Sequence, residues 1–279
     1  MTGYWDIHNH ILPGVDDGSS CMRETMSLLQ AEYEQGIRHL IVTPHYRRGM
    51  FEIGFEDIQK VYEKTRLYCE ETFPSMHLYL GRECFVSSVN RAEKILSDSR
   101  YYMAGRPVVL LEFGYETEYA MIFQTVLMAQ EAQVIPVLAH IERYRALQNQ
   151  DAVRRIRKAG ASVQINCESI LGKTGFRTKH FCQKLLKEKL VDLIASDAHN
   201  TDQRQVHMRE SMTLVEKKYG SAEVERIFCT ESRIIILHRR ERSIIDAGIN
   251  HNRTNNIVSC YERNISKTSY QSGVYRCGE

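Results

Sequence analysis

The sequence predicts an α/β fold built around a parallel barrel, and three observations lead to that prediction. Short apolar runs alternate with segments of helical periodicity along most of the chain. The apolar runs are continuous more often than alternating, as expected of strands buried on both faces. Acidic residues and histidines follow these runs directly, at the strand ends where parallel α/β folds build active sites. A doubly wound open sheet is the alternative arrangement.

Seven strand candidates can be taken in order along the chain. They are the run that ends at Asp6 and the segments 38–43, 77–80, 107–111, 134–139, 161–165 and 191–195. Between them, Met22, Met26, Leu29 and Tyr33 recur at helical spacing and predict a core-facing helix that stops at Gly36. The other predicted helices start at Ile58, with an end near Pro74, and span 90–99, 118–132, 150–159 and 178–189.

Composition and charge limit the function classes. The chain has 279 residues, of which 43% are hydrophobic and 26% charged, so it can bury a substantial core. A net charge of +2 gives no electrostatic case for nucleic acid or an anionic membrane as a partner. The sequence contains neither an export signal nor an apolar run of about 18 residues. We therefore expect a cytoplasmic protein without membrane insertion.

Two further features concern the cysteines and the C-terminal segment. Eight cysteines are scattered without a C-x-x-C pair, which argues for reduced, mainly structural thiols and against a zinc ribbon. From about Glu241 onward, Asn, Ser, Arg and Thr dominate and hydrophobic periodicity fades. We interpret residues 1–242 as one catalytic domain and residues 243–279 as an appendage whose composition is typical of disordered segments.

The stretch from Asp6 to Gly18 concentrates potential metal ligands. If the opening strand continues, Asp6, His8 and His10 point to the same side, and two imidazoles at a strand end can share one ion. Pro13-Gly14 then turns the chain and brings Asp16 and Asp17 within reach as hard oxygen donors. Spacing alone does not decide which of these two aspartates is a ligand.

Further candidates occur at the ends of the later strands. They are His45, Glu83, Glu112, His140, Asp197 and His199. Mixed imidazole and carboxylate ligands suit manganese, iron or zinc, and their number exceeds what one ion can use. Metals about 3.5 to 4 Å apart favour phosphoester hydrolysis. Arg143 and Arg204 follow two of the candidates closely and carry the fork-shaped group that matches phosphate oxygens.

These motifs resemble a known superfamily. Asp6-Ile-His-Asn-His-Ile-Leu-Pro-Gly-Val-Asp-Asp-Gly18, Thr43-Pro-His45, Gly81-x-Glu83, Leu111-Glu112, Ala139-His-Ile-Glu-Arg-Tyr144 and Ser196-Asp-Ala-His-Asn200 are similar to motifs of the PHP (polymerase and histidinol phosphatase) superfamily. Within it they resemble the manganese-dependent protein-tyrosine phosphatases encoded beside capsule and exopolysaccharide genes of Gram-positive bacteria. The resemblance runs from about residue 4 to about residue 237.

The resemblance implies a distorted (β/α)7 TIM-like barrel (the PHP fold) with three metal ions, most favourably manganese, at its C-terminal rim. By motif position, the ligand sets are His8, His10, Glu83 and Asp197; Glu83, Glu112 and His140; and Asp17, His45 and His199. Arg143 and Arg204 would hold the substrate phosphate, which a metal-bound hydroxide would attack without a covalent phosphoenzyme. The substrate so implied is phosphotyrosine on a tyrosine autokinase that regulates polysaccharide export.

Rival functions remain at this point. A cysteine-dependent tyrosine phosphatase is rejected, because it needs five residues between Cys and Arg, whereas Arg91 lies one residue too far from Cys84. A metal amidohydrolase commonly uses a central lysine, but here the middle strands end in Glu83 and Glu112. The nearer alternatives are a PHP phosphoesterase acting on histidinol phosphate or a nucleotide, and a non-catalytic metal-binding scaffold. Oligomeric state is not predicted.

Overall fold

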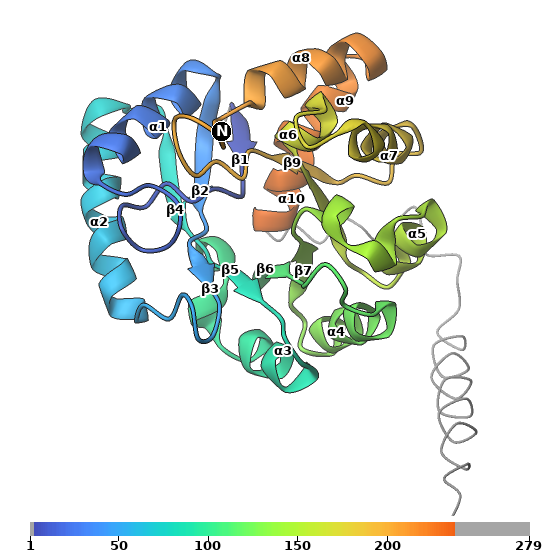
Figure 1. Cartoon of the computed structure of the whole chain (residues 1–279). Coiled ribbons are helices and arrows are strands. Elements are labelled where there is room, and N and C mark those ends of the chain that lie inside the picture. Colours follow the sequence, from blue (N-terminus) through green and yellow to red (C-terminus); the bar gives the residue numbers. More distant parts are fainter. Residues whose placement is uncertain (1–2, 238–279) are drawn as a thin grey trace, which may run out of the picture. The chain divides into compact units, whose positions relative to one another are not determined.

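The computed structural model describes residues 3–237, which form a curled parallel sheet surrounded by helices (Figure 1). All strand pairs are parallel. The strands are β1 (Tyr4–Asp6), β2 (Ile37–Val42), β3 (His45–Tyr46), β4 (His77–Leu80), β5 (Glu83–Phe85), β6 (Val108–Glu112), β7 (Ile135–Leu138), β8 (Ser162–Asn166) and β9 (Leu193–Ala195). The predicted appendage, 243–279, lies outside the described residues.

Seven strand positions follow one another around the sheet, as the sequence predicts. β2 and β3 are one chain segment interrupted at Thr43-Pro44, and β4 and β5 are one segment interrupted at Gly81-Arg82. The sheet orders are β1-β2-β4 and β3-β5-β6-β7-β8-β9, so spatial neighbours follow chain order throughout. A parallel bridge between Asn9 and Ala198 brings the first segment beside the last. This order is that of a distorted barrel, and it excludes the doubly wound alternative, in which strand order reverses.

Helices cover the outside of the sheet (Figure 1). They are α1 (Met22–Glu34), α2 (Phe55–Thr72), α3 (Val89–Leu96), α4 (Tyr119–Glu131), α5 (Gln150–Lys158), α6 (Cys167–Leu171), α7 (Phe176–Lys187), α8 (Met208–Tyr219), α9 (Ser221–Glu225) and α10 (Glu231–Leu237). The sequence reading predicted α1 to α5 and α7 but not α6 or the helices after residue 207. No helix within residues 3–237 combines the length and apolar character needed to cross a membrane.

Two apolar clusters form the core. The larger one packs the helices against the outside of the strands. The smaller one joins strand residues such as Trp5, Leu110 and Val137 to Ile235 and Ile236 of α10. Because it collects residues from strands all around the sheet, this cluster fills the barrel interior, and α10 closes it (Figure 1). The polar strand ends described below therefore stand on a packed, rigid base.

The buried face of α1 differs from the prediction. The structure buries Thr25, Leu28, Leu29 and Glu32, whereas Met22, Met26 and Tyr33 are only partly buried. The face is rotated because two polar side chains, Thr25 and Glu32, occupy part of it. The Thr25 hydroxyl donates to the carbonyl of Ile11 at 2.7 Å, and Glu32 lies beside Asp6 of β1. The prediction used the spacing of apolar residues alone, so it did not include these buried polar side chains.

Glu32 yields the first prediction, which concerns stability. Burial raises the pKa of Glu32 well above its usual value, and the nearby Asp6 raises it further. The unfolded chain loses this proton near pH 4.5, so native stability falls as pH rises above that value. Glu32→Gln removes the penalty and is expected to raise the free energy of unfolding at pH 8 by about 1 to 3 kcal/mol.

The measurement is denaturant unfolding of both proteins at pH 5 and pH 8, in the same metal-loaded state. The difference between the variant and the parent should grow with pH, because only the parent carries the titrating group. Glu34→Gln, at an exposed position on the same helix, is the matched control and should show no such trend. Equal stabilities of the Glu32 variant and the parent at pH 8 would contradict the account.

Candidate metal centre

The structure brings all nine predicted ligands together at the C-terminal ends of the strands. They form overlapping groups in which one nitrogen or oxygen from each residue lies within 4.8 Å of the others. The groups are His10, Asp17, His45 and His199; His8, Glu83 and His140; His8, His10 and Asp197; and His45, Glu83 and Glu112. Their spacing suits several adjacent ions, although the assignment of each residue as a ligand stays a prediction.

Glu83, the first residue of β5, occupies the centre of the cluster. Its Oε1 lies 3.2 Å from His8 Nε2 and 2.9 Å from His140 Nε2. Its Oε2 lies 3.3 Å from His10 Nε2 and 2.9 Å from His45 Nδ1. A carboxylate that faces four imidazoles with both oxygens is placed as a bridging ligand would be.

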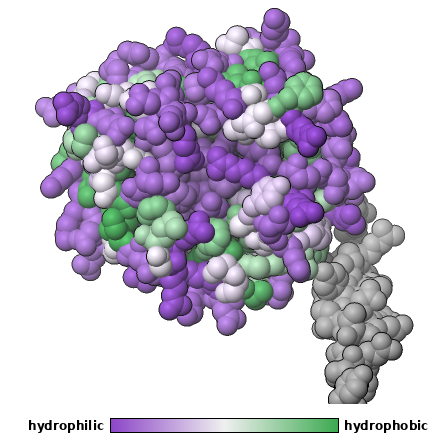
Figure 2. All heavy atoms as spheres, in the orientation of Figure 1, coloured by the Kyte–Doolittle hydropathy of each residue, from purple (hydrophilic) through white to green (hydrophobic). Residues whose placement is uncertain are grey.

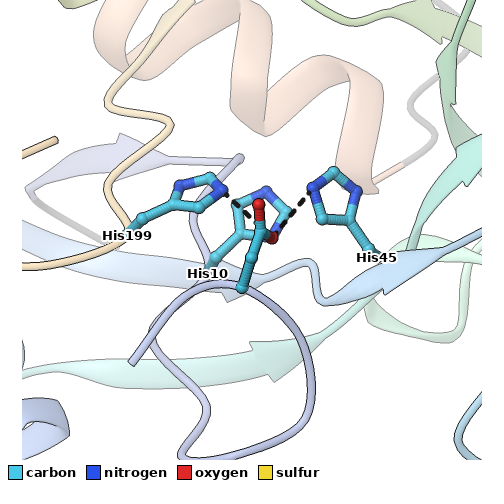
Figure 3. A group of neighbouring side chains, drawn as sticks. His10, His45 and His199 are labelled. Carbon is cyan, nitrogen blue, oxygen red and sulfur yellow. Dashed lines mark ion pairs between the residues drawn. The ribbon is translucent and has the colours of Figure 1, made fainter. Parts of the chain in front are cut away.

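Three imidazoles and one aspartate form the outer part of the cluster. His10, His45 and His199 face one another from three different chain segments (Figure 3). Asp17 Oδ1 lies 3.4 Å from His45 Nε2 and 3.6 Å from His199 Nε2, and half of its side chain is exposed. Because His10 also belongs to the group with His8 and Asp197, it stands between two of the predicted ligand sets.

Asp16 has a different position from Asp17. Its Oδ2 lies 2.8 Å from His10 Nδ1 and accepts the backbone N–H of His45 at 2.9 Å. Its Oδ1 accepts the N–H of Gly18 at 3.0 Å. Asp16 therefore orients an imidazole and fixes the turn, as a carboxylate behind a metal ligand does. The geometry separates the two aspartates, which spacing alone left open.

The backbone is strained at two of the predicted ligands. His140 has φ 31° and Asp197 has φ 52°, both in the left-handed region that residues with a side chain rarely adopt. Each is the second residue after a strand, His140 after β7 and Asp197 after β9, at the rim of the barrel. Such conformations persist where the surrounding structure holds them and concentrate at functional sites. Here the left-handed turns direct both side chains into the cluster.

Two residues of β8 support the cluster, and the sequence reading did not select them. Gln164 Oε1 accepts the N–H of His140 at 2.8 Å and lies 3.1 Å from His8 Nδ1. Asn166 Nδ2 donates to Asp197 Oδ2 at 2.6 Å. The signal was present, because Gln164 and Asn166 alternate with apolar residues along a buried strand and so share one face. Polar residues at such positions orient ligands from behind.

Asp6 does not join the cluster, contrary to the expectation from strand alternation. Its Oδ2 accepts the Ser196 hydroxyl at 2.5 Å, and Glu32 lies beside it on the α1 side. The reason is that β1 ends at Asp6, so the alternation does not extend to His8 and His10. Asp6 instead ties β1 to the segment that leads into Asp197.

The two predicted arginines meet at Asp197. Arg143 Nη2 lies 3.1 Å and Arg204 Nη2 2.8 Å from Asp197 Oδ2. Both line a cavity of about 210 Å³, together with predicted ligands and with Arg47. We call it the inner cavity; its walls are Asp17, His45, Arg47, Met50, Phe51, Glu83, Glu112, His140, Arg143, Asp197 and Arg204. Two guanidinium groups beside a cluster of metal-type ligands suit an anion such as phosphate.

The charges of the cluster are strongly coupled. Burial disfavours the charged form of His8, but the carboxylates of Glu83 and Asp197 outweigh it and raise its pKa to about 9. Burial raises the pKa of Glu112 to about 7, and the charge of Glu83 adds to the effect. Burial lowers the pKa of His140 to about 4, assisted by Arg143. Opposed shifts within one pocket are typical of functional sites.

Several ligand atoms also lack hydrogen-bond partners. Within the described residues these buried atoms are Nδ1 of His45, Oε2 of Glu83, Oε2 of Glu112, Nδ1 of His140 and Nε2 of His199. Buried polar atoms in native proteins almost always have partners. Divalent cations would satisfy these atoms and offset the charge of the carboxylates, so the residues present fit a metal centre.

Comparisons with known proteins agree with this geometry. The family model "Capsular polysaccharide synthesis, CpsB/CapC" matches residues 4–237. The tyrosine-protein phosphatase CpsB of Streptococcus pneumoniae is 34% identical over 244 residues, which cover 83% of this chain and 98% of that protein. The tyrosine-protein phosphatase YwqE of Bacillus subtilis is 30% identical over 224 residues, covering 77% and 85%.

A solved structure gives the same result. The match comes from crystal structures of YwqE from Bacillus subtilis and CpsB from Streptococcus pneumoniae, described as unique metal-dependent tyrosine phosphatases. It has a TM-score of 0.73 and 28% identity, and covers 84% of this chain and 94% of the matched chain. The prediction of a barrel and of a capsule-related family is thereby confirmed. This chain belongs to the CpsB/CapC family of capsular polysaccharide synthesis proteins.

Proposed function

We propose that this protein is a metal-dependent protein-tyrosine phosphatase that hydrolyses phosphotyrosine. The observation that carries the proposal is the inner cavity, where Arg143 and Arg204 converge on Asp197 beside the nine-residue cluster. The names of the family relatives support the same activity. Phosphoester hydrolysis needs both charge neutralisation and an activated water, and this arrangement offers sites for each.

Three ions, with manganese favoured over iron or zinc, are the metal content we propose. His8, His10, Glu83 and Asp197 would hold one, Glu83, Glu112 and His140 a second, and Asp17, His45 and His199 a third. When bound, divalent metals polarise phosphate oxygens and lower the pKa of water. Imidazole and carboxylate donors without a cysteine suit these ions.

The chain's own residues then position the substrate. Arg143 and Arg204 hold the phosphate oxygens through their planar forks, which match that geometry. In the structure both form ion pairs with Asp197, and all three residues line the inner cavity. The tyrosyl oxygen has an unperturbed pKa of about 10 and leaves comparatively well. For this reason we assign no general acid.

The proposed partner is a tyrosine-phosphorylated protein, specifically a bacterial tyrosine autokinase of polysaccharide export in the cytoplasm. The family's connection with capsular polysaccharide synthesis supports this choice. The net charge of +2 is too small to favour nucleic acid as the partner instead.

The test, and the second prediction, is a side-by-side assay of the manganese-loaded protein on a phosphotyrosyl peptide, histidinol phosphate and a nucleotide. We expect the highest kcat/KM on the peptide. Faster hydrolysis of histidinol phosphate or the nucleotide would establish another phosphoesterase, and no hydrolysis of any would favour a non-catalytic scaffold.

The same assay after alkylation of thiols separates this mechanism from a cysteine-dependent one. Burial raises the pKa of Cys84 to about 12, so this thiol next to Glu83 stays protonated. Among the described residues, no cysteine lines the inner cavity. Iodoacetamide is therefore expected to leave the rate of hydrolysis unchanged. Loss of activity after alkylation would contradict the metal mechanism.

A further inference from the structure

A second, larger cavity adjoins the inner one. We call it the side cavity; its volume is about 500 Å³. The two cavities share Arg47, Glu112, His140 and Arg143 as walls, so they lie side by side along these residues. Ligand pockets in proteins measure about 300 to 1,000 Å³. The inner cavity, at about 210 Å³, holds a group the size of phosphate, whereas the side cavity has room for an organic ligand.

Four aromatic residues form part of the wall of the side cavity. Phe85, Phe113, Tyr115 and Tyr144 contribute to it. The rings of Phe113 and Tyr144 meet edge to face, with centroids 5.8 Å apart. The backbone N–H of Phe113 donates to the Tyr144 hydroxyl at 3.1 Å, which holds the Tyr144 ring in place. Edges and faces presented in this way are what a further aromatic ring packs against.

Arg47 stands where the two cavities join. Its guanidinium lies 4.2 Å from the centre of the Phe85 ring. It lines both cavities, but no ion pair with a carboxylate is found for it among residues 3–237. A cation at this junction suits a ligand whose anionic end enters the inner cavity and whose aromatic part remains in the side cavity.

The rim of the side cavity carries two exposed aromatic residues. Tyr115 is 63% exposed and lines the side cavity, and Phe176 is 80% exposed between Thr174 and Thr178, which line it as well. Figure 2 shows that the face drawn there is mostly hydrophilic, with only small apolar patches. Exposed aromatic residues beside a cavity mark a contact surface more often than isolated ones do.

We propose that the side cavity is the subsite for the tyrosyl ring of the substrate, with Tyr115 contacting the adjoining peptide. The inference rests on the proposed function, because it takes the phosphate to lie between Arg143 and Arg204. Arg143 belongs to both cavities, so a ring attached to that phosphate enters the side cavity directly. Tyr115 and Thr174 are specificity residues in this proposal, and neither belongs to the metal-type cluster.

The test uses two variants of the full-length, manganese-loaded protein. Tyr115→Ala removes part of the aromatic wall, and Thr174→Trp fills the cavity from an exposed position. Each is expected to raise KM for a phosphotyrosyl peptide about three- to tenfold, the range of one aromatic contact. The inhibition constant of inorganic phosphate, which needs only the inner cavity, should change less than the peptide KM.

Matched controls are Leu67→Ala and Leu67→Trp, since Leu67 is 57% exposed on α2 and lines neither cavity. Both should behave as the parent protein. Parental KM values for Tyr115→Ala and Thr174→Trp would overturn the side-cavity subsite while leaving the phosphatase function standing. A parent protein that binds phosphate but hydrolyses no phosphotyrosyl peptide would overturn both.

Discussion

Exhaustive chelation of the metal-loaded protein is expected to abolish hydrolysis of a phosphotyrosyl peptide, and added manganese to restore it. The inner cavity explains why. Among the described residues that line it, none is a serine, threonine or cysteine, so the chain presents no hydroxyl or thiol nucleophile there. Without cations, the carboxylates of Glu83, Glu112 and Asp197 face the position of an incoming phosphate dianion and repel it.

Loss of metal and of activity is also expected when the central carboxylate of the cluster, Glu83, is replaced. Glu83→Gln removes the negative charge and one of the two oxygens that face His8, His10, His45 and His140. It should therefore lower metal content together with kcat/KM. Because removal of a partner behind a metal ligand already costs about 10- to 100-fold, loss of a central ligand should cost more than about 100-fold. Glu63→Gln, on the exposed side of α2, is the matched control. Full activity after exhaustive chelation would exclude the metal mechanism.

The positions of the cluster residues were predictable because they follow from strand ends. In a parallel barrel, the residue after each apolar run reaches the same rim, so His45, Glu83 and Glu112 converge although the first and the last are 67 positions apart in the chain. This argument needs only the order of the strands. It does not need their exact bounds, and breaks such as Thr43-Pro44 left it intact.

What could not be predicted depends on side-chain packing between distant segments. Asp16 and Asp17 are adjacent in sequence, but they contact different histidines. The folded turn places Asp16 beside His10 and places Asp17 beside His45 and His199. The burial of Glu32 beside Asp6 likewise joins a helix to a strand through two acidic groups, which any hydrophobic pattern places at the surface. Pairs of this kind are invisible to periodicity because neither partner is apolar.

The side cavity shows a third limit. Phe113 and Tyr144 lie on loops that follow different strands, and their arrangement depends on the edge-to-face contact of the rings and on the bond from the Phe113 backbone N–H to the Tyr144 hydroxyl. Sequence analysis of the same residues could note only that they flank Glu112 and Arg143. The ligand cluster follows from chain topology, whereas the shape that selects a substrate follows from loop packing.

Arg143→Ala is expected to lower kcat on the phosphotyrosyl peptide by about 100- to 1,000-fold, the effect of removing one preorganised donor from a reacting oxyanion. Metal content should remain parental, because Arg143 belongs to none of the ligand groups and, within residues 3–237, the one ion pair of its side chain is with Asp197. Arg143→Lys should recover little, since an ammonium group is a point charge that cannot bond two phosphate oxygens in the planar manner of a guanidinium.

The control is Arg145→Ala, two residues along the chain, where the exposed guanidinium pairs with Glu116 and lines neither cavity. It should retain parental kinetics and metal content, which separates a loss of positive charge in this loop from a loss of phosphate binding. An Arg143→Ala protein with an unchanged rate would remove Arg143 from the site. If the variant lost metal as well, the residue would instead act by holding Asp197, because that carboxylate is its one ion-pair partner within residues 3–237.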